Sequence, residues 1–332
     1  MTDLNRRHLL AGGAGLALSG LSAGARAQAQ LRWNLPCAYP TQNFHTENLV
    51  AFARDVEQAT SGRLSITVHA NASLFPAPQI KRAVATGQAQ IGEVLLSIHE
   101  NEDAIFGLDV VPFVATSFAE SRRLWQASKA HIERRLASQG LTVLFAVPWG
   151  PQGIYANRAI NTVEDMRGLR WRSYNAGTTR LAELLGMQSV TIQAAELPQA
   201  LATGVVNSFM SSGSTGYDSK VWESLSHFYD CQAWLPKNVT FVNTAAFNAL
   251  DAATKQAITT AGATAETRGW ARSEEIAGWY LNELRSKGMS VQPASEGLMA
   301  GLRRAGETLT ADWIRRAGAD GQAIIEAYRR SA

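Results

Sequence analysis

Apolar and polar residues follow two periods along this chain, and their order predicts alternating strands and helices. Residues 31–35 alternate apolar and polar side chains, as a half-buried strand does. Residues 44–59 instead place Leu49, Phe52 and Val56 at helical spacing. The two patterns continue as far as residue 95 and predict a β-α-β-α-β unit. Its expected elements are strands 31–35, 64–69 and 89–95 and helices 44–59 and 80–86.

A second unit of the same kind is predicted between residues 161 and 212. Thr162 precedes an acidic turn, as a helix cap does, and Gly168 ends that short helix. Strands and helices then alternate with short connections, which is typical of an α/β unit. The expected elements are strands 169–174, 189–193 and 205–210 and helices 178–185 and 196–203.

Arg172 is the candidate binding residue of the second unit. It stands near the carboxyl end of strand 169–174, and ligands collect at such strand ends in α/β sheets. A guanidinium binds a carboxylate through two parallel hydrogen bonds and stays charged at any pH. Arg170 shares the same strand face and is a second candidate cation. The alternation alone equally predicts that both arginines are solvated surface residues.

Three motifs in this second unit resemble the signature of a known family. Residues 160–172, INTVEDMRGLRWR, are followed by Leu185-Gly186 and then by ALATGVV at 200–206. Their order and spacing are similar to those of TRAP-transporter solute-binding proteins, the tripartite ATP-independent periplasmic receptors of the dicarboxylate-receptor (DctP) type. The similarity extends from about residue 31 to the C-terminus. It implies a two-domain, periplasmic-binding-protein-like α/β fold with a long domain-spanning helix and a central ligand cleft.

The resemblance also implies a function and a boundary between the domains. A protein of this family is a receptor and not an enzyme, and it delivers an organic acid to a TRAP membrane component. Arg172 matches the arginine that grips the ligand carboxylate. Domain I is expected to comprise residues 28–149 plus 238–277, and domain II residues 150–237 plus 278–332.

Departures from the family pattern predict the type of ligand. Gln152 replaces a second arginine that many relatives carry, and Ala194 replaces a phenylalanine. Ser211 replaces a ligand-binding asparagine, and Leu95 stands where a polar contact is common. Each change lowers charge or polarity, or adds room. The changes therefore favour a monocarboxylate with an apolar body, aromatic or branched, over a C4-dicarboxylate.

Five aromatic residues are candidates for the wall of the site. Tyr39 and Trp149 are predicted in loops at strand ends, and Phe209, Tyr217 and Trp234 are the other three candidates. Packing in the core explains each of them equally well when it is taken alone. Three further tryptophans are expected in the core, namely Trp33, Trp171 and Trp279.

The N-terminus has the pattern of an export signal. Arg6 and Arg7 precede an apolar, Ala/Gly-rich stretch, and residues 25–27, ARA, fit a cleavage site, so residues 1–27 are expected to be removed. The paired arginines resemble a twin-arginine signal, and a general secretory leader is the alternative. Either route predicts a periplasmic protein. Without the leader, 31 basic and 28 acidic residues become 28 and 27, and a net charge of +1 offers nothing to nucleic acid.

The remaining reactive residues favour neither a cofactor nor catalysis. Cys37 and Cys231 are far apart, so both a disulfide and two buried free thiols are open possibilities. The histidines lack metal-binding spacing, and no nucleophile, base and orienting group occur together. We therefore expect no cofactor and no metal. Two alternatives to the TRAP receptor are an exported α/β enzyme acting on small carboxylic acids and a receptor of an ATP-driven importer, which would lack the long helix.

Overall fold

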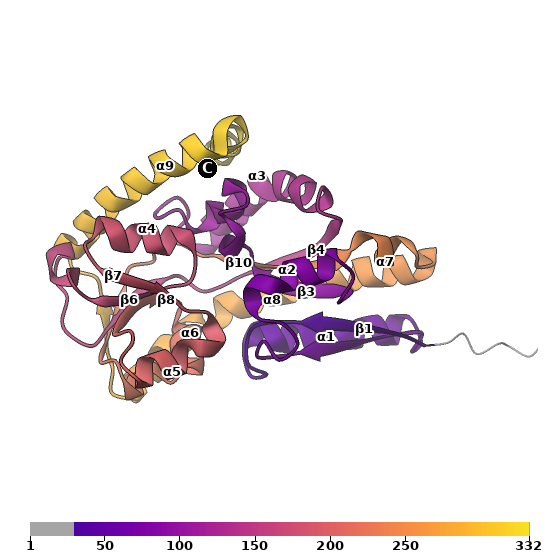
Figure 1. The fold of residues 1–332 in the computed structure, drawn as a ribbon, viewed down its shortest axis with the longest axis horizontal. Coiled ribbons are helices and arrows are strands. Elements are labelled where there is room, and N and C mark those ends of the chain that lie inside the picture. The colour runs from indigo at the N-terminus through magenta and orange to yellow at the C-terminus, as the bar shows by residue number, and fades with distance from the viewer. Residues whose placement is uncertain (1–29, 332) are drawn as a thin grey trace, which may run out of the picture.

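The computed structural model describes residues 30–331, whose strands form two lobes (Figure 1). The first lobe combines a parallel pair, β1-β2, with a three-stranded sheet in the order β3-β10-β4. Its strands are β1 (Leu31–Pro36), β2 (Leu64–His69), β3 (Ile91–Leu95), β4 (Leu141–Pro148) and β10 (Lys237–Asn243). Its helices are α1 (Phe44–Ala59), α2 (Ala77–Ala85), α3 (Phe118–Ala137) and α7 (Thr244–Asn248), with 3₁₀ helices η1 (Leu96–His99) and η2 (Ala104–Val110).

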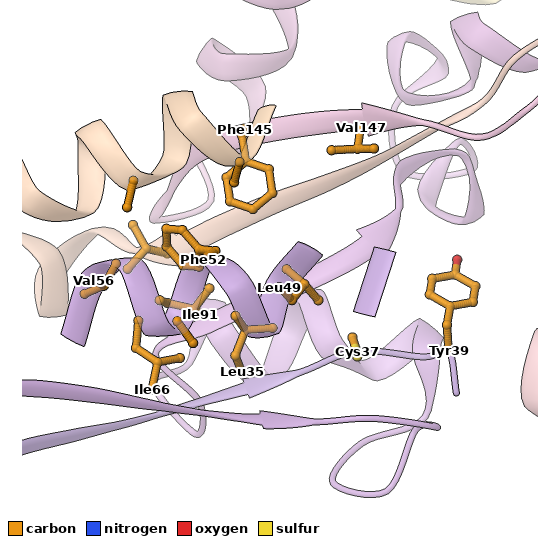
Figure 2. Close-up of a cluster of buried hydrophobic side chains, with 14 of the residues drawn as sticks. Leu35, Cys37, Tyr39, Leu49, Phe52, Val56, Ile66, Ile91, Phe145 and Val147 are labelled. Atoms are coloured by element: carbon orange, nitrogen blue, oxygen red, sulfur yellow. The ribbon is translucent and has the colours of Figure 1, made fainter. Parts of the chain in front are cut away.

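Helix α1 anchors the core of the first lobe. Asn43 caps it, because its side-chain oxygen accepts a hydrogen bond of 2.9 Å from the backbone N–H of His45. The apolar face of α1 packs over β1 and against β4 (Figure 2). Each large apolar side chain buried in this way contributes about 1.5–3 kcal/mol. The cluster ends at Tyr39, in the loop after β1, which is thereby fixed at the edge of the lobe.

The second lobe is built on a six-stranded sheet in the order β11-β9-β5-β8-β6-β7. Strand β6 pairs in parallel with β7 and with β8, so the predicted β-α-β-α-β unit is confirmed. The strands are β5 (Gly153–Ala156), β6 (Arg170–Ser173), β7 (Gln188–Thr191), β8 (Ser208–Ser211), β9 (His227–Asp230) and β11 (Ser290–Pro293). The helices are α4 (Ala176–Leu184), α5 (Leu197–Ala202) and α6 (Gly213–Asp218), with 3₁₀ helices η3 (Val163–Met166), η4 (Ala194–Glu196) and η5 (Val221–Glu223).

Two long helices join the lobes. Helix α8 (Ala252–Ser286) packs on α1 and β4 of the first lobe and on α6 of the second. Helix α9 (Glu296–Arg330) contacts η3 and α4 of the second lobe and η2 and α3 of the first, and it is kinked at Gly318 (Figure 1). The sequence predicts one helix from residue 247 to 287. The structure breaks it before Ala252, because Asp251 caps α8 by accepting a 2.8 Å hydrogen bond from the Thr254 N–H.

A glycine allows α8 to lie close to the sheet of the first lobe. A Cβ atom added at Gly269 would stand 2.4 Å from Cγ2 of Val147 on β4, well inside van der Waals contact. The strand that carries Val147 leads directly to Trp149. Helix and strand are therefore packed closely beside the segment that passes from one lobe to the other.

Two further expectations have clear outcomes. Trp33 and Trp171 are buried as expected, but Trp279 is 46% exposed, because it lies on the solvent side of α8 among other aromatic rings. Cys37 and Cys231 are both buried and unbonded. Across residues 30–331, no helix combines the length and the apolar character that crossing a membrane requires. The expected leader, residues 1–27, lies outside the described residues.

Candidate ligand-binding site

A cavity of about 40 Å³ lies between the two lobes. The first lobe and its adjoining segments provide one wall, and the second lobe provides the other. The lining residues are Ala38, Tyr39, Ala77, Leu95, Ile98, Trp149 and Pro236 on the first wall and Gln152, Arg172, Tyr174, Gln193, Ala194, Ser211 and Thr215 on the second. The two walls differ in chemistry, because almost every polar side chain stands on the second.

Arg172 supplies the charge of the cavity. It lies on β6, is only 3% exposed, and its Nε donates a hydrogen bond of 2.8 Å to the backbone oxygen of Ile192. The guanidinium carbon lies 5.0 Å from the centre of the Tyr174 ring. No acid among residues 30–331 forms a salt bridge with it, so its two terminal nitrogens remain available. Burial lowers the pKa of Arg172 to about 10, which still leaves it charged at neutral pH.

Tyr174 lines the cavity and has a hydroxyl that can still donate a hydrogen bond. The Trp234 indole N–H donates a 3.0 Å hydrogen bond to the Tyr174 oxygen from behind. The hydroxyl therefore accepts from Trp234 and keeps its own hydrogen for another partner. Burial raises the pKa of Tyr174, so the hydroxyl stays protonated at neutral pH.

Gln152 is the neutral polar group on the same wall. Its side-chain nitrogen donates a 2.9 Å hydrogen bond to the backbone oxygen of Gly150. Its backbone N–H donates to the Trp234 oxygen, and its backbone oxygen accepts from the Ala233 N–H, both at 3.0 Å. One amide hydrogen and the amide oxygen are left over. Ser211, at the end of β8, adds a buried hydroxyl. These groups can bind a neutral polar atom, but they cannot neutralise a second charge.

The opposite wall presents mainly apolar surface to the cavity. The rings of Tyr39 and Trp149 meet edge to face, with centres 4.7 Å apart, and Leu95 and Ile98 extend the apolar surface. Such a wall gains free energy by covering apolar atoms of a ligand, at about 25 cal/mol per Å².

The structure brings seven of the ten predicted site residues to this cavity. They are Arg172, Gln152, Tyr39, Trp149, Ala194, Ser211 and Leu95. Phe209 does not line it, because its ring stacks on Tyr155 of the neighbouring strand, 4.6 Å between centres, in the core of the second lobe. Trp234 does not line it either, since it stands behind Tyr174. Tyr217 is also outside the lining, because its ring packs against Trp279 and Tyr280 of α8. Whether the seven bind a ligand stays a prediction.

Sequence reasoning missed the other half of the lining. Tyr174 had a usable signal, because it follows Arg172 by two residues and thus shares its strand face. The remaining residues, contributed by loops and helix starts, carry no such signal: Ala38, Ala77, Ile98, Gln193, Thr215 and Pro236. Arg170, the second candidate cation, is exposed and extends toward Gly204, so it does not face the cavity.

A larger groove of about 620 Å³ adjoins the cavity and shares Ile98, Tyr174 and Gln193 with it. Its charged residues are balanced in sign. Arg180, for example, forms a salt bridge of 2.9 Å with Glu183. We place the candidate site in the smaller cavity, since its buried arginine has no acid partner in the described part of the chain. In residues 30–331 no group of three or more potential ligands is arranged to hold a metal ion.

The family follows from comparison with known proteins. Residues 38–316 match the family described as "Bacterial extracellular solute-binding protein, family 7". The chain belongs to this family. It is a TRAP solute receptor with the two-domain fold that the resemblance implied.

Solved structures of similar receptors cover nearly the whole chain. DctP6, a Bordetella pertussis extracytoplasmic solute receptor binding pyroglutamic acid, is 53% identical, with a TM-score of 0.89 over 90% of this chain and 99% of that one. A marine metagenome TRAP solute-binding protein specific for pyroglutamate is 43% identical, with a TM-score of 0.90 over 91% and 99%. A Desulfovibrio salexigens TRAP protein with bound orotic acid shares the fold at 19% identity, a TM-score of 0.83 and coverage of 91% and 98%. These TRAP relatives are receptors and not enzymes.

Two asparagines that do not line the cavity connect the lobes. Asn43 caps α1 with its oxygen, and its amide nitrogen donates a 2.6 Å hydrogen bond to Asp218 of the second lobe. Asn175 caps α4 in the second lobe, and its amide nitrogen donates a 3.0 Å hydrogen bond to the Ser97 hydroxyl of the first. Each side chain thus caps a helix in its own lobe and binds the other lobe.

Replacing Arg172 with lysine should weaken ligand binding without unfolding the protein. A lysine keeps the positive charge but cannot donate two parallel hydrogen bonds to a carboxylate. We expect a loss of roughly 2–4 kcal/mol of affinity for the acid that the wild type binds. Titration calorimetry measures the loss, with Arg170→Lys, a change at the exposed arginine of the same strand, as the control. Near-normal affinity of Arg172→Lys would make the arginine structural.

Replacing Asn43 with aspartate should open the cleft in a pH-dependent way. Aspartate keeps the helix cap but turns the donor that faces Asp218 into a second carboxylate. Burial raises the pKa of Asp218 to about 6, with nearby Glu47 adding to the rise. In the variant the pKa of Asp218 should rise further, because the Asn43 donor that lowers it is replaced by a carboxylate. Repulsion should therefore develop well above pH about 6, where both carboxylates are ionised, and should fade at lower pH, where the pair holds a proton.

Small-angle X-ray scattering of the free protein measures this opening as a larger radius of gyration. The matched control is Asn175→Asp, which also keeps its cap but faces Ser97, a hydroxyl that can donate to a carboxylate. Equal radii for the two variants at pH 8 would contradict a connecting role for Asn43.

Proposed function

We propose that this TRAP receptor captures pyroglutamate and delivers it to TRAP membrane components. The observation that carries the proposal is the charge pattern of the cavity, where the buried Arg172 is the single charged residue among those that line it. One cation balances one carboxylate, whereas a second buried carboxylate left unpaired would cost several kcal/mol. Pyroglutamate has one carboxylate and, at its other end, a neutral lactam ring.

The rest of the lining suits the lactam ring. Its carbonyl needs donors and its N–H needs an acceptor, and Tyr174, Gln152 and Ser211 provide both kinds of group. The carbons of the ring can lie against Tyr39 and Trp149. The departures at Gln152, Ala194, Ser211 and Leu95 favour an apolar monocarboxylate, and the small cavity narrows this choice to a compact ring over a bulky aromatic body. The receptors that are 53% and 43% identical, both of them pyroglutamate-binding, support the same choice.

The place of action and the domain boundaries complete the proposal. Residues 1–27 act as a signal peptide, and the mature receptor works in the periplasm. Residues 28–149 plus 238–277 form domain I, and residues 150–237 plus 278–332 form domain II, a division supported by the two groups of strands. Ligand contacts with both domains provide the differential affinity that favours the closed cleft.

A panel of organic acids tests the ligand. We expect pyroglutamate to bind most tightly, other small monocarboxylates and bulky aromatic ones less tightly, and succinate and malate least. A thermal-shift screen followed by titration calorimetry gives the order, since a tight ligand well above its Kd stabilises by several kcal/mol. Gln152→Arg should move the order toward dicarboxylates, because it restores a second cation to the wall. If wild type bound succinate or malate more tightly than pyroglutamate, the proposed ligand would be wrong.

The leader has its own test. Expression of the full chain in a bacterium that exports through both routes should yield a mature protein that begins at or near Gln28 in the periplasmic fraction. N-terminal sequencing of that protein measures the site. Arg6→Lys with Arg7→Lys should block export on the twin-arginine route and leave a general secretory route unaffected. Full-length protein confined to the cytoplasm would contradict export.

A further inference from the structure

The two aromatic rings of the first wall share one hydrogen-bond acceptor. The Tyr39 hydroxyl donates to the Asn238 side-chain oxygen at 3.3 Å, and the Trp149 indole N–H donates to the same oxygen at 2.8 Å. Figure 2 shows Tyr39 at the end of the apolar cluster, with its hydroxyl oxygen pointing away from the loop that carries it. Both donors of the aromatic wall are therefore used inside the protein.

Asn238 is itself held rigidly behind the wall. It lies on β10, the central strand of the three-stranded sheet, where it pairs with Leu95 on β3 and with Val147 on β4. Its amide nitrogen donates a 2.9 Å hydrogen bond to Glu93, and both residues are only 1% exposed. Because the amide nitrogen of Asn238 is bound to Glu93, the orientation of the amide group is fixed. Its oxygen therefore faces the Tyr39 and Trp149 rings.

The groups behind the wall are neutral at pH 7. Burial raises the pKa of Glu93 to about 8, so this acid carries its proton. His45 lies against Trp149, with ring centres 4.3 Å apart, and burial lowers its pKa well below the usual value. A carboxylate held at Arg172 thus meets no buried negative charge on the opposite side.

We propose that Asn238 is a specificity-determining positioning residue, which makes the first wall a hydrocarbon surface by accepting the hydrogens of Tyr39 and Trp149. The inference rests on the proposed function, because it takes the ligand carboxylate to be bound at Arg172. It assigns all hydrogen bonding of the ligand to the second lobe. The lactam group of pyroglutamate can turn to the polar side chains of the second wall, whereas a ligand whose second polar group must face the first wall finds no donor there and is rejected.

The inference predicts different effects for two substitutions in the same hydrogen-bond group. Tyr39→Phe removes a hydroxyl that is already used inside the protein, so affinity for pyroglutamate should change by less than about threefold. Asn238→Leu keeps a similar shape but releases both donors toward the cavity. Its affinity for pyroglutamate should fall by about tenfold or more, while affinity for succinate should stay the same or rise.

The measurement is the ratio of the Kd for succinate to the Kd for pyroglutamate, taken by calorimetry on the full mature protein. Thr142→Val, a change of nearly equal shape on the neighbouring strand β4 and outside the cavity lining, is the control and should leave the ratio unchanged. A purely structural role for Asn238 would weaken both ligands by the same factor. If Asn238→Leu does not fold, Asn238→Ser, whose hydroxyl is too short to reach both rings, takes its place.

The outcomes separate this inference from the proposed function. A lower ratio in the Asn238 variant, with near-normal Tyr39→Phe, supports the positioning role. An unchanged ratio overturns it while leaving pyroglutamate as the ligand. A loss of about tenfold or more in Tyr39→Phe also overturns it, because the hydroxyl would then bind the ligand directly. Failure of the wild type to bind pyroglutamate would overturn the proposed function and this inference together.

Discussion

The buried guanidinium of Arg172 is the constraint on which the rest of the structure depends. A charge removed from water is costly unless it is bound by partners, and here the protein itself supplies only the Ile192 oxygen and the face of Tyr174. The parallel strands β6, β7 and β8 hold this arginine at the edge of the second lobe, and the first lobe covers it. The two lobes therefore shield a charge that neither of them neutralises with an acid from residues 30–331.

The covering lobe contributes shape and apolar surface. Its sheet, the helix α1 and the long helix α8 pack closely enough to fix Tyr39 and Trp149 as a rigid wall. Polar groups behind that wall are bonded to one another and not to the cavity. The site thus depends on residues far apart in the sequence, each placed by a different element, which is typical of a cleft between two α/β domains.

The local sequence pattern predicted those helices and strands that have a regular hydrophobic period and a clear capping residue or glycine at their ends. Helix α1 was predicted with its observed bounds, and strand β6, with Arg172 at its end, was correct to within a residue. Strands β5, β9 and β11 were missed, because each has four residues and lies outside the predicted β-α-β-α-β units, whose repeat made the equally short β6, β7 and β8 recognisable. In the site, the family resemblance located Arg172, because alternation alone left it equally a surface residue, and its strand face would then have added Tyr174. The prediction for Phe209 was wrong because strand alternation shows on which side of the sheet a residue lies. It does not show that the ring of a neighbouring residue, here Tyr155, covers it. Asn238 carries no signal at all, since its role arises only when β10 pairs between β3 and β4.

The unequal chemistry of the two walls also orders the events of binding. An anion approaching the open cleft finds its electrostatic partner on the second lobe alone, so the encounter is a charge-directed step that added salt weakens. Closure of the first lobe then removes apolar surface from water. That step has the thermodynamics of hydrophobic burial: a negative heat-capacity change and a driving force that grows on warming near room temperature. Ionic strength thus acts mainly on capture, and temperature mainly on retention.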